Sequence, residues 1–180
     1  DDLIEAARTI TAMDKVHRSL PACPQMHGTG MWIGTLVALN CGGTVVPQRT
    51  SHLDADALIQ CVIDNQVTDL TIVGDAFARP ILAALDAAQD AGTPYDLSRV
   101  GQIASSGVMW SSEIKEGLLR HHDMILNDIM GSTEGSMGGS ISTRDGAAKT
   151  AKFMVADYVK VLNEDDEPVK PGSGEMGMVA

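Results

Sequence analysis

The nine residues GSTEGSMGG, at positions 131–139, combine the side chains that most directly suggest chemistry, and they follow an apolar stretch that predicts a β-strand. Gly131 lets a ligand approach the backbone, and the hydroxyls and amides of Ser132 and Thr133 suit the oxygens of a phosphate. Glu134 adds a carboxylate that could hold Mg²⁺ beside those oxygens. The segment is therefore a candidate nucleotide-phosphate site. A flexible Gly/Ser loop with an exposed glutamate is the more common explanation of such residue types and stays open.

A second candidate is SSGVMWSSE, at positions 105–113, which follows one predicted strand and opens a predicted helix. Its small residues would let a flat group lie against the backbone, whose amides could bond the edge of a base. An ordinary strand-to-helix turn has the same composition. Residue types alone therefore leave a nucleotide contact and a structural turn both open.

A third candidate, PQMHGTGMW at positions 24–32, places His27 before two glycines and a predicted buried helix. The imidazole could line and gate a pocket, although a histidine held by structural hydrogen bonds is the more frequent case. Four methionines whose flexible side chains would suit an apolar substrate fall in or beside the three segments: Met26, Met31, Met109 and Met130.

The elements that must position these segments alternate between strand and helix. Strands are predicted in four places: 44–46, 69–74, 101–105 and 124–130. Helices are predicted at 1–20, 31–40 (with a buried strand as the alternative), 54–66, 76–91 and 111–121. This alternation is typical of βαβ units, so we expect an α/β fold with a mostly parallel sheet, flanking helices, and ligands at the strand ends.

The residues after Gly139 have a different pattern. They alternate more strictly, contain a tight acidic turn at 164–167, and predict a β-hairpin followed by a Pro-Gly connection to another strand. We therefore expect two parts, an α/β lobe at 1–145 and a smaller β segment at 146–180.

The composition narrows the range of partners. The 180 residues are 44% hydrophobic and carry a formal net charge of −11. Nucleic acids and anionic membranes favour clustered Lys and Arg, so the charge favours a small-molecule partner and no nucleic acid. The absence of a run of 18 apolar residues and of CxxC spacing predicts a cytoplasmic chain with reduced cysteines and no integral membrane segment. The oligomeric state stays unknown.

Taken in order, these strings resemble the adenylate-forming (AMP-binding) superfamily, and specifically the large N-terminal domain of bacterial acyl-CoA synthetases, or fatty-acid–CoA ligases. MHGTGMWIGTLVALNCGGTVVP is similar to the family's His-Gly segment, SSGVMWSSE to its adenine-contacting loop, and IMGSTEG to its aromatic-Gly-x-Thr-Glu signature. The last hairpin ends in the family's Gly-Glu-apolar-Gly pattern at 174–177. The similarity covers about residues 20–180.

The resemblance implies that a carboxylic acid, fatty or sterol-derived, is activated with ATP as acyl-AMP and then transferred to CoA. It implies that Thr133 and Glu134 are catalytic, with Thr133 on the adenylate phosphate and Glu134 on Mg²⁺. His27 and Trp32 would border the acyl pocket. The resemblance also implies a set of nucleotide-binding residues: Ser106, Gly107, Val108, Asp128, Ile129, Met130, Gly131, Ser132 and Thr133.

The sequence departs from the family pattern in two respects. Met130 stands where the family usually has an aromatic residue that packs on the adenine. The phosphate loop expected before residue 1, the ribose-binding aspartate, and the lysine-bearing domain expected after residue 180 fall outside the sequence. We therefore expect an internal fragment that is inactive by itself in a pyrophosphate-exchange assay. A non-enzymatic nucleotide-binding domain and a structural lobe of a larger enzyme are the alternatives.

Overall fold

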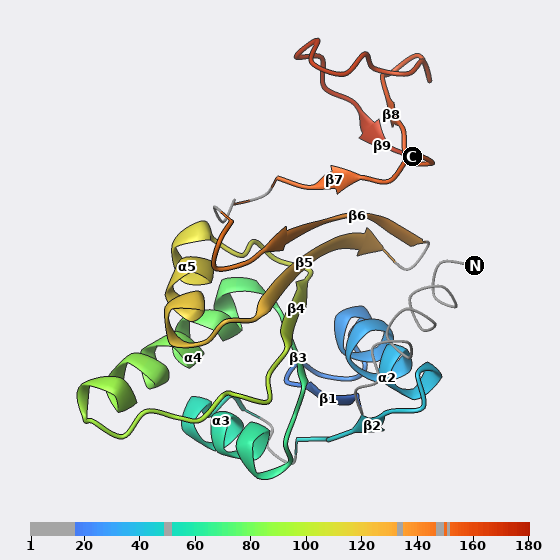
Figure 1. Cartoon of the computed structure of the whole chain (residues 1–180). Coiled ribbons are helices and arrows are strands. Elements are labelled where there is room, and N and C mark those ends of the chain that lie inside the picture. The colour runs from blue at the N-terminus through green and yellow to red at the C-terminus, as the bar shows by residue number, and fades with distance from the viewer. Residues whose placement is uncertain (1–16, 49–51, 133–134, 147–149, 151) are drawn as a thin grey trace.

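The computed structural model describes residues 17–48, 52–132, 135–146, 150 and 152–180. Within these residues, seven strands form one sheet in the order β2-β1-β3-β4-β5-β6-β7 (Figure 1). The first five are parallel, and β6 and β7 are antiparallel to their neighbours. The bounds of the strands are β1 (Arg18–Pro21), β2 (Thr44–Val45), β3 (Asp69–Ile72), β4 (Gln102–Ser106), β5 (Ile125–Ser132), β6 (Gly135–Ser142) and β7 (Met154–Val155).

Helices cover both faces of this sheet. On one face lie α3 (Ala55–Asp64), α4 (Gly74–Asp90) and α5 (Ser112–His121), and on the other lie the π-helix η1 (Thr29–Leu36) and the α2 turn (Val37–Asn40) (Figure 1). This arrangement confirms the predicted α/β class with a mostly parallel sheet and flanking helices. It also separates the chain between β1 and β2 from the three helices of the opposite face.

The helix α3 shows how local sequence sets these elements. The Asp54 side chain accepts a hydrogen bond of 3.0 Å from the backbone N–H of Ala57, as expected of an N-cap aspartate. Leu58, Ile59 and Val62 are buried and share one face of the helix. The cap and the apolar face agree with the helix predicted at 54–66.

The strand β1 was not predicted. The helix predicted at 1–20 is wrong for residues 18–20, which belong to this strand. Arg18–Pro21 form a strand between β2 and β3, whereas residues 1–16 lie outside the described part. Ser19, Leu20 and Pro21 are all buried because this strand has neighbours on both sides and helices or loops on both faces. A strand buried in this way lacks the polar alternation by which a strand is recognised.

Two further expectations need correction. The segment predicted as a buried helix at 31–40 is helical, but Met31, Trp32 and Leu39 are exposed. The segment predicted as a loop at 131–139 is mostly β-hairpin, since its first two residues extend β5 and β6 begins at Gly135, with a register shift after Met130. Small residues continue a strand as readily as they form a loop, so composition alone did not distinguish the two.

The C-terminal residues contain the predicted β structure. The strand β7 pairs with β6, whereas β8 (Val161–Leu162) and β9 (Met178–Val179) form a separate antiparallel pair. The acidic turn is present, because the Asn163 side chain accepts hydrogen bonds from the backbone N–H groups of Asp165 and Glu167. The domain boundary near residue 145 stays a prediction.

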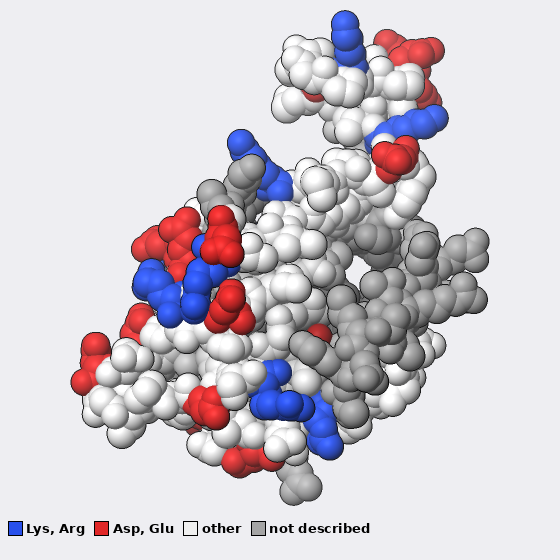
Figure 2. Space-filling view, in the orientation of Figure 1, with Lys and Arg blue, Asp and Glu red and all other residues white. Residues whose placement is uncertain are grey.

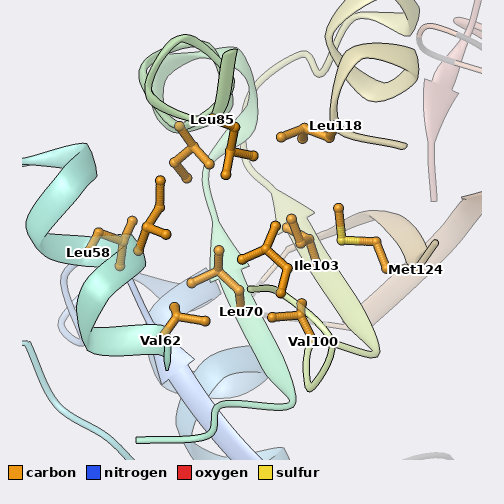
Figure 3. Close-up of a pocket in the computed structure, with 11 residues that line it drawn as sticks. Leu58, Val62, Leu70, Leu85, Val100, Ile103, Leu118 and Met124 are labelled. Carbon is orange, nitrogen blue, oxygen red and sulfur yellow. The ribbon is translucent and has the colours of Figure 1, made fainter. Parts of the chain in front are cut away.

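The core lies between the sheet and α3, α4 and α5, and it contains a small apolar cavity of about 20 Å³ (Figure 3). That volume holds roughly one water-sized molecule, so neither a nucleotide nor an acyl chain fits. Its lining includes Leu58 and Val62 of α3, Leu85 of α4, Leu118 of α5, Leu70 of β3 and Ile103 of β4. The cavity is therefore a packing void.

Among the described residues, no helix combines the length and apolar character needed to cross a bilayer.

Truncation of Leu118 tests this core. Leu118 is fully buried and borders the cavity, so Leu118→Ala enlarges an existing void and should lower the free energy of unfolding by about 2–5 kcal/mol. Urea denaturation followed by circular dichroism measures the change. Glu116→Ala, on the exposed side of the same helix, is the matched control and should change stability by less than about 0.5 kcal/mol. Equal effects of the two substitutions would contradict the packing described here.

Candidate functional site

The three candidate segments meet at one edge of the sheet. Because β1, β3, β4 and β5 are parallel, their carboxyl ends lie at the same edge. The segment at 24–32 follows β1, the segment at 105–113 begins at the end of β4, and the segment at 131–139 begins at the end of β5. In the register of β4 and β5, Ser106 is opposite Ile129; Gly107 is the first residue after β4, and Met130 is the next residue of β5.

Gly107 joins the first two segments in space. Its φ of +95° lies in the region that favours glycine, and a β-carbon there would be 3.4 Å from His27 Cε1 and 3.7 Å from Thr29 Oγ1. The backbone N–H of Thr29 donates to His27 Nδ1 at 3.2 Å, so the neutral imidazole carries its proton on Nε2. His27 is exposed. The edge therefore presents a histidine N–H donor beside a bare stretch of backbone.

The other side chains of the first two candidate segments differ in exposure. Ser106 is buried, whereas Val108 and Met109 are 53% and 60% exposed. Trp32 is 43% exposed and lies near the turn at 24–28, since a β-carbon at Gly28 would be 3.7 Å from Trp32 Cδ1. The first two candidate segments thus carry exposed apolar side chains.

The end of β5 contributes both buried and exposed groups. The Asp128 carboxylate is buried and lies 2.8 Å from Lys115 Nζ, so its charge is paired within the protein. Ile129 and Met130 are half-buried, and the next two positions, Gly131 and Ser132, are exposed. The remaining predicted phosphate and metal residues, Thr133 and Glu134, lie outside the described residues.

The start of α4 fixes the turn after β4. Asp75 Oδ1 accepts hydrogen bonds from the backbone N–H of Ser111 at 2.9 Å and from its hydroxyl at 3.1 Å. The backbone N–H of Asp75 donates to the Met109 carbonyl at 3.1 Å, and that of Gly74 donates to Ser105 Oγ at 2.8 Å. A β-carbon at Gly74 would lie 2.5 Å from the Met109 carbonyl oxygen, so only glycine permits this approach.

The environment of Asp75 favours its charged form. Burial by itself would raise the pKa of this carboxyl group, but the two hydrogen bonds from Ser111 and the Arg79 guanidinium at 2.9 Å outweigh it. The pKa of Asp75 therefore lies below its usual value. The carboxylate remains ionised at neutral pH and holds the turn through charge-assisted hydrogen bonds.

The start of α5 is held by a distant residue. The backbone N–H of Ser112 donates to Thr150 Oγ1 at 2.7 Å, while the hydroxyl of Ser111 bonds Asp75 rather than the helix. The predicted helix start at Ser111 or Ser112 is confirmed, but its cap comes from the segment after β6. Residues far apart in sequence therefore fix both ends of the turn at 107–111.

Sequence reasoning missed the contacts that hold the site, namely those of Asp75 with Ser111 and of Lys115 with Asp128. The sequence pattern placed Asp75 only at the start of the helix predicted at 76–91. For Lys115 a signal existed, because Asp128 sits in an apolar strand where a buried carboxylate needs a cation, and Lys115 lies next to Ile114 on the apolar face of α5. The pairing itself could not be inferred from sequence spacing.

The described residues contain no group of three or more His, Cys, Asp and Glu side chains that could hold a metal ion. Mg²⁺ commonly binds one or two carboxylates together with substrate phosphate oxygens, so it does not need such a group.

A family comparison assigns the chain to a class of proteins. A statistical model of the AMP-binding enzymes matches residues 2–178, so the chain belongs to the AMP-binding enzyme family. Among characterised proteins, it is 36% identical over 163 residues to the medium/long-chain-fatty-acid–CoA/3-oxocholest-4-en-26-oate–CoA ligase of Mycolicibacterium smegmatis. It is 35% identical over 171 residues to the 3-oxocholest-4-en-26-oate–CoA ligase of Rhodococcus rhodochrous. Each match covers 89% of this chain, and the chain spans about 29% of each relative.

Solved structures share the fold. CmiS6 matches 98% of this chain with a TM-score of 0.75 and 15% identity, and the match covers 42% of that protein. The N-terminal subdomain of Klebsiella oxytoca NpsA, in complex with 3-hydroxybenzoyl-AMSN, matches 98% of the chain with a TM-score of 0.66 and 15% identity, over 45% of its own length. At this identity the likeness establishes the fold alone.

Removing the charge of Asp75 tests how the turn is held. Because the folded pKa is lowered, the stabilisation is fully present above the unfolded pKa of about 3.9 and is lost as the pH falls through the folded pKa. Asp75→Asn should therefore be less stable than wild type by roughly 1–2 kcal/mol between pH 7 and about pH 5. The difference should shrink below about pH 4. Urea denaturation across this pH range measures it.

Asp123→Asn, a change of the same charge at an exposed position, is the control and should give only a small, nearly constant difference. A difference for Asp75→Asn that grows as the pH falls would show that the carboxylate is not held in its charged form by the fold.

Proposed function

We propose that the protein carrying this chain activates a carboxylic acid with ATP as acyl-AMP and then transfers the acyl group to CoA. The observation that carries the proposal is that the approach of His27 to Gly107 and the end of β5 at Met130 lie at the same edge of the sheet, in a member of the AMP-binding enzyme family. The relatives are named as CoA ligases for fatty and sterol-derived acids, which supports the same class of substrate. A cytoplasmic location and the inactivity of the 180 residues by themselves stay predictions.

In the proposed arrangement, the adenine lies between the backbone at 106–108 and the end of β5 at 128–130. The bare backbone of Gly107 and the adjacent N–H and C=O groups suit the flat face and edge of a base. The half-buried thioether of Met130 would pack where an aromatic ring is usual. Since the Asp128 carboxylate is paired with Lys115, its contribution to binding would come from the backbone.

The phosphates would follow along Gly131–Thr133, with Glu134 as the carboxylate that holds Mg²⁺. Gly131 and Ser132 are exposed beside that position, so phosphate oxygens can approach them, and a single carboxylate with phosphate oxygens suffices for Mg²⁺. Bound Mg²⁺ would neutralise charge on the phosphate oxygens. The contribution of the chain is to orient the α-phosphate and to place hydroxyl and amide donors around it.

The chemistry would proceed in two steps. A carboxylate oxygen of the acid attacks the α-phosphorus of ATP, the bond to pyrophosphate breaks, and acyl-AMP forms. The thiolate of CoA then attacks the acyl carbon, and AMP leaves with the bonding electron pair. His27 and Trp32 would border the acid, with His27 offering the Nε2–H donor and Trp32 an apolar wall.

Loss of the Glu134 charge tests the catalytic assignment. Acyl-CoA formation by the complete protein is first screened over carboxylic acids from acetate to long-chain and sterol-derived acids, with ATP, Mg²⁺ and CoA. With the best acid, Glu134→Gln should lower kcat/KM for adenylation by about 100-fold or more, because charge on the phosphates is less well neutralised. Glu116→Gln on the exposed side of α5 should leave activity unchanged. The assignment would be overturned if none of the screened acids were converted to its acyl-CoA, or if Glu134→Gln had the same kcat/KM as wild type.

Truncation of Trp32 tests the acyl wall. Trp32→Ala removes an apolar ring beside the turn at 24–28, so it should raise KM for the best long acid by about tenfold, corresponding to a loss of roughly 1–3 kcal/mol of apolar contact. KM for ATP should stay within about twofold, since Trp32 is not one of the residues of the proposed base site. Leu39→Ala, an exposed apolar residue of α2, is the control and should change neither value. A parallel rise in KM for ATP would contradict the placement.

A further inference from the structure

Lys115 of α5 is fully buried, which is rare for a lysine. Charged side chains of both signs gather over α5 on the face shown in Figure 2, and Glu116 and Arg120 of this helix are exposed. Lys115 instead lies inside the protein, with Nζ 2.8 Å from Asp128 Oδ2 and 5.3 Å from the centroid of the Trp110 ring. Its charge therefore meets a carboxylate and an aromatic face rather than water.

Stability alone does not account for such a pair. Taking an ammonium and a carboxylate out of water costs about as much as their attraction returns, and apolar residues of similar size are often as stable in their place. Removal of one partner, in contrast, leaves an uncompensated buried charge. What a buried pair can supply is a fixed distance and direction between the elements that carry its members, and the elements joined here are those of the proposed base site.

The pair spans the two sides of that site. Trp110 lies in the turn after β4, three residues beyond Gly107. Asp128 lies in β5, two residues before Met130. Lys115 contacts both, so it holds the turn and the strand end at a set separation.

The Trp110 ring depends on this contact. Trp110 is fully buried, and its Nε1 has no hydrogen-bond acceptor among the described residues. The position of the ring is therefore set by packing and by the attraction between the ammonium and the π face, rather than by a hydrogen bond of the indole. If the ammonium is lost, the ring and the turn that carries it can shift.

We propose that Lys115 is a positioning residue for ATP, which sets the width of the adenine slot between Gly107 and Met130 without touching the nucleotide. The inference rests on the proposed function, and it goes further by naming a residue that acts through Trp110 and Asp128. It predicts an effect on ATP in particular, whereas a general structural role would affect all substrates and the stability together.

The decisive variant replaces both charges in the complete protein. Lys115→Met/Asp128→Leu keeps similar volumes and removes both charges of the pair together, so it should fold with a Tm close to that of wild type. Its KM for ATP should nevertheless rise by about tenfold or more, with KM for the acid and for CoA changed less than about twofold. Steady-state kinetics with each substrate varied in turn and thermal denaturation measure these values.

A second variant remains informative if the double variant does not fold. Trp110→Phe keeps an aromatic ring but weakens its attraction to the ammonium, and it should raise KM for ATP by about threefold. Asp86→Asn is the control, because it alters a different side-chain contact of α5, the one of 2.8 Å between Asp86 Oδ1 and His121 Nε2, and should leave every KM unchanged. A folded variant with an unchanged KM for ATP, or with equal rises in all three KM values, would overturn the inference.

Direct ATP binding by equilibrium dialysis separates this inference from the proposed function. If wild type forms acyl-AMP but Lys115→Met/Asp128→Leu matches its ATP affinity, only the inference fails. If wild type binds ATP but forms no acyl-AMP with any acid, the proposed function fails. The inference is then decided by comparing the ATP affinity of Lys115→Met/Asp128→Leu with that of wild type, and a loss of about tenfold supports it. If wild type binds no ATP, both fail.

Discussion

The parallel pairing of β1, β3, β4 and β5 is the constraint on which the candidate site depends. Parallel strands must return by a crossover, so each carboxyl end reaches the same edge and each following turn begins there. Three segments that are separated by many residues in sequence therefore reach the same edge of the sheet. The approach of His27 to Gly107 and the register that ends with Ser106 opposite Ile129 both follow from this one property of the sheet.

Pairing alone does not fix the shape of a turn, and the structure adds specific contacts for that purpose. Gly74 allows α4 to begin against the Met109 carbonyl, and Asp75 holds Ser111 from the same helix. Lys115 then contacts the ring of Trp110, the residue next to Ser111. The turn after β4 is thus held from two helices and a strand, which restricts its motion more than the backbone of a short turn would.

Sequence patterns predicted the elements whose signals are local. The Asp54 cap and the apolar face of α3 were sufficient for that helix, and the alternation of strands and helices was sufficient for the class of sheet. Strand β1 was missed because burial on both faces removes its alternation, and the hairpin of β5 and β6 was missed because its glycines and serines are typical of loops. The Lys115–Asp128 pair was missed for a different reason, since it is a tertiary contact in which neither residue is unusual until its burial is known.

The two halves of the proposed site differ in how firmly they are held. The turn after β4 is fixed by hydrogen bonds and a buried ion pair, whereas the side near η1 presents the exposed Met31 and Trp32. The π-helical geometry of η1, in which Thr35 Oγ1 donates to the Gly30 carbonyl at 2.9 Å, is uncommon and is frequently found at functional sites. A preorganised surface suits a ligand that does not vary, because little ordering is needed on binding. Flexible apolar side chains suit a ligand whose size and shape vary. On this argument the nucleotide would meet the rigid half, and selectivity for the acid would arise from the side chains of η1.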